Sequence, residues 1–138
     1  MPSAAYAKYT AAIEPMLEGD NAGTAAWKVA LAATVNAADT TFTPGTTDLP
    51  TGGGYTQGGA AASTTSASQT AGTYKLVLAS PAVWTATPGG FTFRYAILWN
   101  STSSVPVAYW DYGSSQVVAD TETVTVTLNA GTGVFTAS

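Results

Sequence analysis

The stretch FTFRYAILW, residues 91–99, has the pattern that decides the fold class. Its large apolar side chains recur at every second position, which is the period of a β-strand. The residues on this predicted face are Phe91, Phe93, Tyr95, Ile97 and Trp99. Ala96 and Leu98 make the opposite face apolar too, so we expect a central strand covered on both sides from mid-length onward.

Segments of the same kind occur along the rest of the chain, separated by turns rich in Gly and Pro. They are WKVAL (27–31), YKLVLAS (74–80), VPVAYWDYG (105–113), TVTVTL (123–128) and a closing segment, 132–137. We therefore predict one mainly β domain, residues 1–138, with a β-rich half at 74–138. The expected architecture is an antiparallel β-sandwich or barrel-like domain of about seven to nine short strands.

The first residues predict a short N-terminal α-helix, residues 3–18. Tyr6, Tyr9 and Ile13 recur at helical spacing after Ser3, which can cap a helix. This apolar stripe has two interpretations: it packs on the sheet of its own domain, or it docks on a neighbouring subunit.

Residues 36–73 predict an extended loop region, because Pro and Gly interrupt any regular period there. Its second part, GGAAASTTSASQTAGT (58–73), contains no apolar residue larger than alanine. Such a composition is typical of a linker, but alternating Ala, Ser and Thr can also form a strand where space is tight.

The composition argues against several classes of function. The 138 residues carry a formal net charge of −4 with only four Lys and Arg residues, so we expect no nucleic-acid partner. The chain has no cysteine and no histidine, which excludes disulfides, thiolate metal sites and the commonest general base. The start lacks a signal-peptide pattern and no apolar run approaches membrane-spanning length, so we expect no membrane partner.

The stretch GGGYTQGG, residues 52–59, raises the question of a phosphate-binding loop. A phosphate loop needs Lys followed by Ser or Thr directly after the last glycine, whereas the first lysine after this stretch is Lys75. We expect instead an irregular backbone with positive φ at several glycines. Tyr55 would anchor this loop against the domain itself or against the next subunit.

Three acidic residues are candidates for catalysis, Asp111, Asp120 and Glu122. Asp120 and Glu122 share one face of a predicted strand, in polar sequence where solvation is the ordinary explanation. Asp111 has aromatic neighbours, and a desolvated carboxylate would have a raised pKa. The favoured interpretation is structural: Asp111 accepts hydrogen bonds from turn amides near Gly113 and pairs with Arg94 on the adjacent strand. We expect no enzymatic activity, no cofactor and no bound metal.

Aromatic residues on strands can also bind sugar rings. The possible platform consists of Trp99, Tyr109, Trp110 and Tyr112. Because aromatic-rich strands usually bury their rings, we favour a core role for these four side chains.

An ordered set of short motifs covers nearly the whole chain. These are LEGD (17–20), WKVAL (27–31), GYTQGG (54–59), VW (83–84), FRYAILWN (93–100), VAYWDYG (107–113) and GVFT (133–136). In this order the chain resembles a family of small structural proteins of tailed-bacteriophage virions, labelled decoration, head-fibre or minor structural proteins. The resemblance implies a β-sandwich-like virion component without catalysis. It does not extend to the long Ala/Ser/Thr stretch.

We therefore expect a bacteriophage capsid decoration (cement) protein that binds the outer surface of the major capsid protein and stabilises the head. Its partners would be the capsid protein and copies of itself, with a trimer as the family-level expectation. It would be assembled in the host bacterial cytoplasm and located on the capsid surface. The candidate interface residues are Tyr6, Tyr9, Ile13, Tyr55, Gln57, Trp110 and Tyr112. The alternative is a tail or head-fibre component that acts as a carbohydrate-binding or receptor-binding module.

Overall fold

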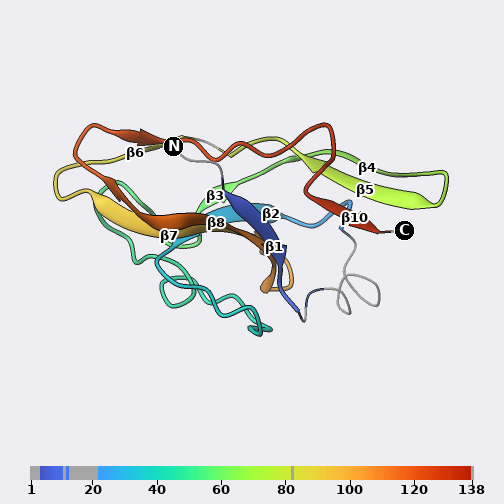
Figure 1. The fold of residues 1–138 in the computed structure, drawn as a ribbon, viewed down its shortest axis with the longest axis horizontal. Helices are drawn as coiled ribbons and strands as arrows, with labels where there is room; N and C mark the ends of the chain where they lie inside the picture. Colours follow the sequence, from blue (N-terminus) through green and yellow to red (C-terminus); the bar gives the residue numbers. More distant parts are fainter. Residues whose placement is uncertain (1–3, 11, 13–21, 82, 138) are drawn as a thin grey trace.

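The computed structural model describes residues 4–10, 12, 22–81 and 83–137. Within this part the protein is mainly β, and every strand pairing is antiparallel. The strands form one five-stranded, one three-stranded and one two-stranded sheet. Figure 1 shows the five-stranded sheet in the middle, with the hairpin of β4 and β5 at one end of the molecule and β6 at the other.

The five-stranded sheet has the order β1-β8-β7-β2-β3. Its strands are β1 (Ala5–Lys8), β2 (Trp27–Ala32), β3 (Ala60–Ala61), β7 (Phe91–Asn100) and β8 (Val105–Val118). The three-stranded sheet has the order β10-β5-β4, from β4 (Thr64–Thr70), β5 (Thr73–Leu78) and β10 (Phe135–Ala137). The small sheet pairs β6 (Trp84–Thr85) with β9 (Thr123–Val124).

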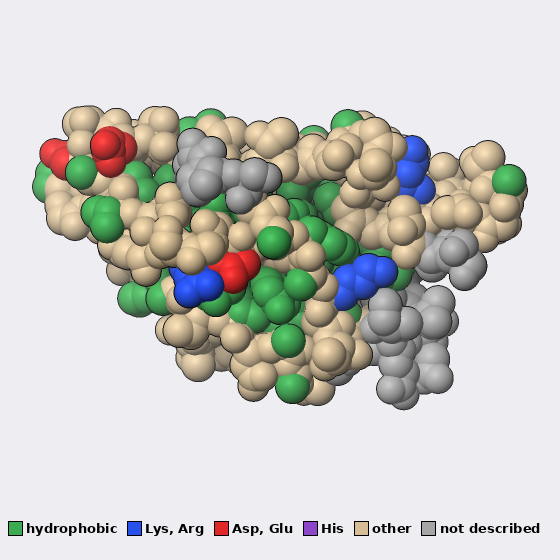
Figure 2. Space-filling view, viewed as in Figure 1, with side chains coloured by type: hydrophobic (Ala, Val, Ile, Leu, Met, Phe, Trp, Pro, Cys, Tyr) green, Lys and Arg blue, Asp and Glu red, His purple; other side chains and the backbone are tan. Residues whose placement is uncertain are grey.

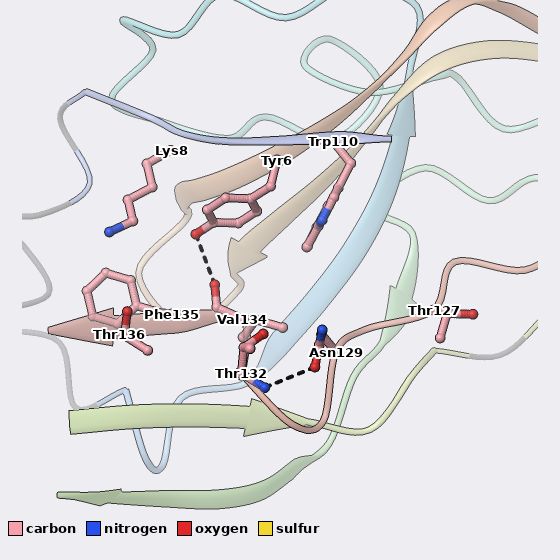
Figure 3. Close-up of a pocket in the computed structure, with 10 residues that line it drawn as sticks. Tyr6, Lys8, Trp110, Thr127, Asn129, Thr132, Val134, Phe135 and Thr136 are labelled. Atoms are coloured by element: carbon pink, nitrogen blue, oxygen red, sulfur yellow. Dashed lines mark hydrogen bonds between the residues drawn. The ribbon is translucent and has the colours of Figure 1, made fainter. Parts of the chain in front are cut away.

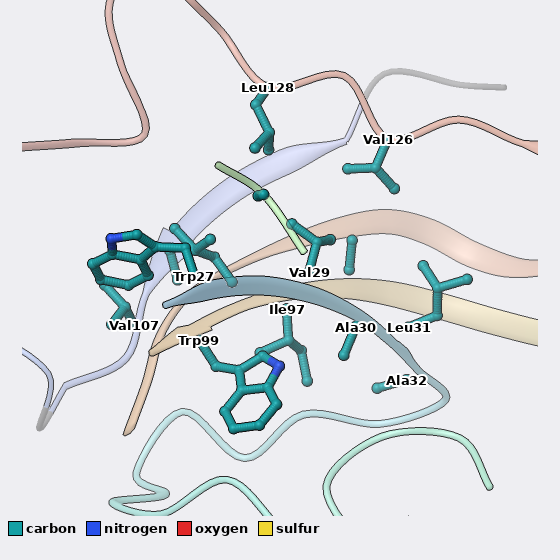
Figure 4. Close-up of a cluster of buried hydrophobic side chains, with 14 of the residues drawn as sticks. Trp27, Val29, Ala30, Leu31, Ala32, Ile97, Trp99, Val107, Val126 and Leu128 are labelled. Carbon is teal, nitrogen blue, oxygen red and sulfur yellow. The ribbon is translucent and has the colours of Figure 1, made fainter. Parts of the chain in front are cut away.

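The predicted central strand is confirmed as β7, which lies between β8 and β2. Ala96, Ile97 and Leu98 are fully buried, because both faces of the sheet are covered at this point. In Figure 4, Val126 and Leu128 lie on one side of β2, and Trp99 lies on the other. The valines and leucine of TVTVTL are buried as expected, although regular pairing in that segment extends over only the two residues of β9.

The predicted aromatic row of β7 is interrupted. The pairing with β8 shifts register between Phe93 and Tyr95. On one side of the shift Phe93 packs edge-on against Tyr112, with ring centroids 5.4 Å apart. On the other side Tyr95 packs against Tyr109 instead. A strict period of two therefore does not hold along the whole strand, because a β-bulge changes which face the following side chains occupy.

The predicted N-terminal helix is not seen among the described residues, and for Ala5–Lys8 the prediction is wrong. This segment is strand β1, which pairs with Ala108–Asp111 of β8. Helical spacing and strand alternation both fit so short an apolar pattern, and pairing with the free edge of β8 gives the backbone its hydrogen bonds. Residues 13–18 of the predicted helix lie outside the described residues.

The predicted loop region 36–73 needs a similar correction. Its second part contains β3 and β4, so the strand interpretation of the Ala/Ser/Thr stretch holds and the linker interpretation does not. Residues 33–59 lie between named strands, and Phe42 from this segment stacks on Trp99 with ring centroids 4.0 Å apart. With β1 included, the described residues form ten strands, one more than the upper limit we expected.

Candidate functional site

The seven candidate interface residues fall into separate places in the structure. Tyr55 lies at the centre of the glycine-rich loop and is only 1% exposed. Its hydroxyl donates to Asp48 Oδ2 at 2.5 Å and accepts from the backbone N–H of Leu31 at 3.0 Å. Of the two predicted roles for this ring, the anchor within the domain is therefore the one that the contacts support.

Asp48 is the residue that organises this loop, and no local sequence pattern marks it. Its carboxylate is 6% exposed and accepts three hydrogen bonds. The donors are the Tyr55 hydroxyl and the backbone N–H groups of Gly45 and Gly58, the latter two at 2.7 and 2.6 Å. Burial, followed by the hydrogen bond to Asp48, raises the pKa of Tyr55 above its usual range. Asp48 thus links Gly45, Tyr55 and Gly58 through hydrogen bonds to one buried carboxylate.

Four glycines of the loop adopt positive φ, as predicted: Gly53, Gly54, Gly58 and Gly59. Gly59 shows why no larger residue fits, because a Cβ there would lie 1.9 Å from the carbonyl oxygen of Val29. Gln57 of the same loop is exposed, and its backbone N–H donates to Thr51 Oγ1.

Tyr9 and Tyr112 also lie in the core rather than at the surface, with exposed fractions of 1% and 9%. Tyr9 packs edge-on against Tyr109, and Tyr112 packs against Phe93. Both rings therefore stabilise the domain itself. Ile13, the remaining candidate near the N-terminus, lies outside the described residues.

The hydroxyl of Tyr9 is buried and has no hydrogen-bond partner among the described residues. Because an unsatisfied buried hydroxyl costs about 1–3 kcal/mol, we expect Tyr9→Phe to raise the free energy of unfolding by about 1 kcal/mol. Urea unfolding monitored by fluorescence measures this change. Tyr74→Phe, at a half-buried position on β5, is the matched control and should change stability by less than about 0.5 kcal/mol. A Tyr9→Phe protein less stable than wild type would contradict the prediction.

The same substitution should alter the alkaline limb of the stability profile. Burial, with a smaller effect of Asp39 and Tyr109, raises the pKa of Tyr9. The stability that depends on neutral Tyr9 is therefore fully present below about pH 10, the pKa of tyrosine in the unfolded chain, and is lost as the pH rises further. Stability should consequently fall less steeply above pH 10 in Tyr9→Phe than in wild type.

Two candidates, Tyr6 and Trp110, meet at the surface. They are cross-strand partners on β1 and β8, and their ring centroids are 5.7 Å apart. Together they line a half-open hollow of about 400 Å³ between this sheet edge and the segment that leads into β10. Tyr6 is 43% exposed, and its hydroxyl donates to the carbonyl oxygen of Val134 at 3.0 Å. Figure 3 shows the two rings along one wall of the hollow and Val134 opposite them.

The other walls come from residues outside the seven candidates. Lys8 places its ammonium group 5.2 Å from the centroid of the Phe135 ring. Asn129 accepts from the N–H groups of Gly131 and Thr132 through Oδ1, so its amide nitrogen stays available as a donor. Lys8 is the one charged residue that lines the hollow within the described part of the chain. No sequence signal marks this set. Its members on β1 are at least a hundred positions away from its members on β8 and in the C-terminal segment.

Of the three acidic residues considered above, Asp111 and Glu122 have structural partners, and Asp120 is exposed. Arg94 donates to both carboxylate oxygens of Asp111, at 2.8 and 3.0 Å, as the favoured interpretation predicted. The N–H of Gly113 also donates to Asp111, and these two donors lower the pKa of this carboxyl group, with Arg94 as the larger cause. Glu122 accepts from the N–H of Ala119 across a turn. Asp111 thus lacks the raised pKa that a general acid would need.

The four aromatic residues of the possible sugar platform do not form one exposed surface. Trp99 is 4% exposed, stacks on Phe42 and donates from its indole nitrogen to the carbonyl oxygen of Gly58 at 3.1 Å. Tyr112 is buried as well, which leaves Trp110 as the half-exposed tryptophan of the set. Tyr109 is half-buried too, and Trp110 lies beside the exposed ring of Tyr6.

The described residues contain no group of three or more acidic side chains that could hold a metal ion. In the same part of the chain there is no helix long and apolar enough to span a membrane. Figure 2 shows one face of the molecule, on which charged side chains are few and lie scattered among polar and apolar atoms. No protein-family model, no curated protein and no solved structure matches this chain.

Proposed function

We propose that this chain is a β-sandwich-like structural protein of a bacteriophage virion that decorates the outer surface of the capsid and stabilises the head. The observation that carries the proposal is the open hollow at which Tyr6 and Trp110 meet. The ordered motifs described above, which resemble phage virion proteins, supply the identity of the partner. The major capsid protein would place a projecting side chain or loop into this hollow.

The chemistry of the hollow suits contact with another protein. The centres of protein–protein interfaces are enriched in aromatic residues and depleted of charge. Here the rings of Tyr6 and Trp110, a buried Phe135 and several threonines line the hollow, and among the described lining residues Lys8 is the single cation. Backbone carbonyls and hydroxyls of a capsid surface could pair with the amide nitrogen of Asn129 without burying an unpaired charge.

Binding to heads that lack the decoration protein tests this proposal. We expect wild-type protein to saturate expanded heads in a co-sedimentation assay. Trp110→Ala and Tyr6→Ala should each weaken binding about 30-fold, the effect of losing a hot-spot residue of about 2 kcal/mol. Gln116→Ala, a polar side chain on β8 outside the hollow, is the matched control and should bind like wild type.

Circular dichroism and thermal unfolding establish that each variant is folded before its binding is compared. Failure of folded wild-type protein to bind heads at any stage of expansion would refute the proposal. Equal binding by wild type and both hollow variants would instead assign the contact to another surface.

The second candidate is a tail or head-fibre component that binds carbohydrate. The specific observation in its favour is that the hollow combines the half-exposed Trp110 with an available amide donor on Asn129, the two kinds of group that recognise a sugar ring. A glycan array distinguishes the candidates. Wild-type binding to an oligosaccharide, lost in Trp110→Ala, together with no binding to heads, would favour the carbohydrate function.

A further inference from the structure

Strand β4, Thr64–Thr70, forms one edge of the three-stranded sheet, and β10 forms the other edge. All side chains from Thr65 to Thr70 are exposed. Figure 1 shows that β4 and β5 project together at one end of the molecule. The hairpin ends in a tight turn in which Ala71 and Gly72 both have positive φ, at 49° and 82°.

This edge lacks the usual protection against pairing with another strand. Edge strands of monomeric proteins commonly carry Lys, Pro, an inward-pointing charge or a covering loop. The sequence of β4, TTSASQT, contains neither proline nor any charged residue. Its one irregularity is a register shift between Thr64 and Ser66, at the base of the hairpin. From Ser66 onward the pairing with β5 is continuous, so the outer edge presents a regular row of backbone groups.

Strand β4 itself has little support from the rest of the domain. β10 pairs with Tyr74–Leu76 of β5, on the side away from β4. Ala67 is exposed although Leu76, its partner on β5, is fully buried. Leu76, Val77 and Leu78 hold β5 in the core, whereas β4 has no strand on its outer side in the described structure. Strand β4 would therefore gain stability from a further strand that pairs with its outer edge.

The charge distribution favours a second copy of this chain as that strand. Two molecules of net charge −4 repel each other, so they should meet where acidic residues are absent. The described residues of the three-stranded sheet include a single charged side chain, the cation Lys75. Antiparallel pairing of β4 with itself places no like charges opposite each other, and Ser and Thr on facing strands can form hydrogen bonds.

We propose that two copies of this protein pair through β4, antiparallel and around a two-fold axis, to form a continuous six-stranded sheet of order β10-β5-β4-β4-β5-β10. The two-fold axis passes through the segment Ser66–Ser68. This pairing does not depend on the proposed binding to capsids, because β4 does not line the hollow.

Disulfide mapping tests the geometry directly, since the full chain contains no cysteine. Single variants Ser66→Cys, Ala67→Cys and Ser68→Cys place one thiol on each copy near the axis. Under mild oxidation we expect a covalent dimer for at least one of them, because a residue next to a two-fold axis faces its own counterpart. Thr41→Cys, exposed in the segment 33–59, is the matched control and should stay monomeric on a non-reducing gel.

Sedimentation equilibrium of the unmodified chain and of a charge variant completes the test. The wild type should be a dimer at micromolar concentrations. Ser68→Lys, which brings two like charges to the paired edges, should raise the dimer dissociation constant at least about fivefold. Thr41→Lys should leave the constant unchanged. A wild type that is monomeric at every concentration, or equal cross-linking of Thr41→Cys and the β4 variants, would overturn the proposal.

Discussion

Replacing Gly59 by alanine should lower the free energy of unfolding by more than about 3 kcal/mol. The added Cβ would lie 1.9 Å from the carbonyl oxygen of Val29 and 2.6 Å from the Cα atom of Ala30. Both atoms belong to the backbone of β2, which is held between β7 and β3 and therefore has little room to shift. The positive φ of +74° adds the ordinary strain of an L-residue in that conformation.

Gly72→Ala separates the steric clash of the added Cβ from the strain of the positive φ. Gly72 has a similar φ of +82°, but in the described structure no atom lies within 4 Å of a Cβ built there. This variant should lose only about 1 kcal/mol, the cost of the backbone conformation alone. Urea unfolding of both variants gives the comparison. Equal losses for Gly59→Ala and Gly72→Ala would show that the close approach to β2 is not what requires glycine at position 59.

The second large effect should come from Asp48→Asn, which we expect to cost about 2–4 kcal/mol. The amide is nearly the same size as the carboxylate, but it has one acceptor oxygen in place of two. Gly45 N–H donates to one carboxylate oxygen, and Tyr55 and Gly58 donate to the other. Either orientation of an asparagine amide therefore directs an NH₂ group at an N–H or O–H donor, and at least one buried donor loses its partner.

Asp120→Asn is the matched control, because Asp120 is exposed and should change stability by less than about 0.5 kcal/mol. Thermal unfolding together with near-ultraviolet circular dichroism measures both the stability and the packing of the tyrosine. If Asp48→Asn were as stable as wild type, the three hydrogen bonds would not contribute to the folded state as we infer.

The strands that the sequence predicted correctly share a simple property. In Trp27–Leu31 and in Phe91–Trp99 the apolar alternation is long, and the side chains are large enough to determine which faces are buried. Pairing of β2 with β7 then follows over six residues without a register shift. The Arg94–Asp111 ion pair was predictable because the two residues were expected on adjacent strands, and they lie on β7 and β8.

The N-terminal segment shows where a local pattern is insufficient. Tyr6 and Tyr9 fit one face of a helix, yet Tyr6 and Lys8 also fit one face of a strand. The structure adopts the strand because β8 offers a free edge, and because the Tyr6 hydroxyl reaches Val134, 128 positions away. The intrinsic preference of four residues is small compared with the hydrogen bonds and ring contacts that such pairing supplies.

The hollow and the Asp48 cluster were hidden for a related reason. Asp48 lies in TTDLP, a sequence that indicates only a turn, and nothing local connects it to Tyr55. Asn129 and Phe135 likewise have no signal that relates them to Trp110. These sets exist only after strands distant in sequence have paired, since burial and hydrogen-bond geometry depend on which segments become neighbours.

By itself the sequence determined that this protein is mainly β, where its longest strands lie, and that its surface carries little charge. Those properties follow from the period of apolar residues and from composition, both of which are local. Only the tertiary structure decided that residues 5–8 form a strand, that GGGYTQGG closes around Asp48, and that Tyr6 and Trp110 meet in a hollow. Each of those outcomes depends on contacts between distant segments, because a free backbone edge, a buried donor or an exposed ring acquires its partner only when the sheets assemble.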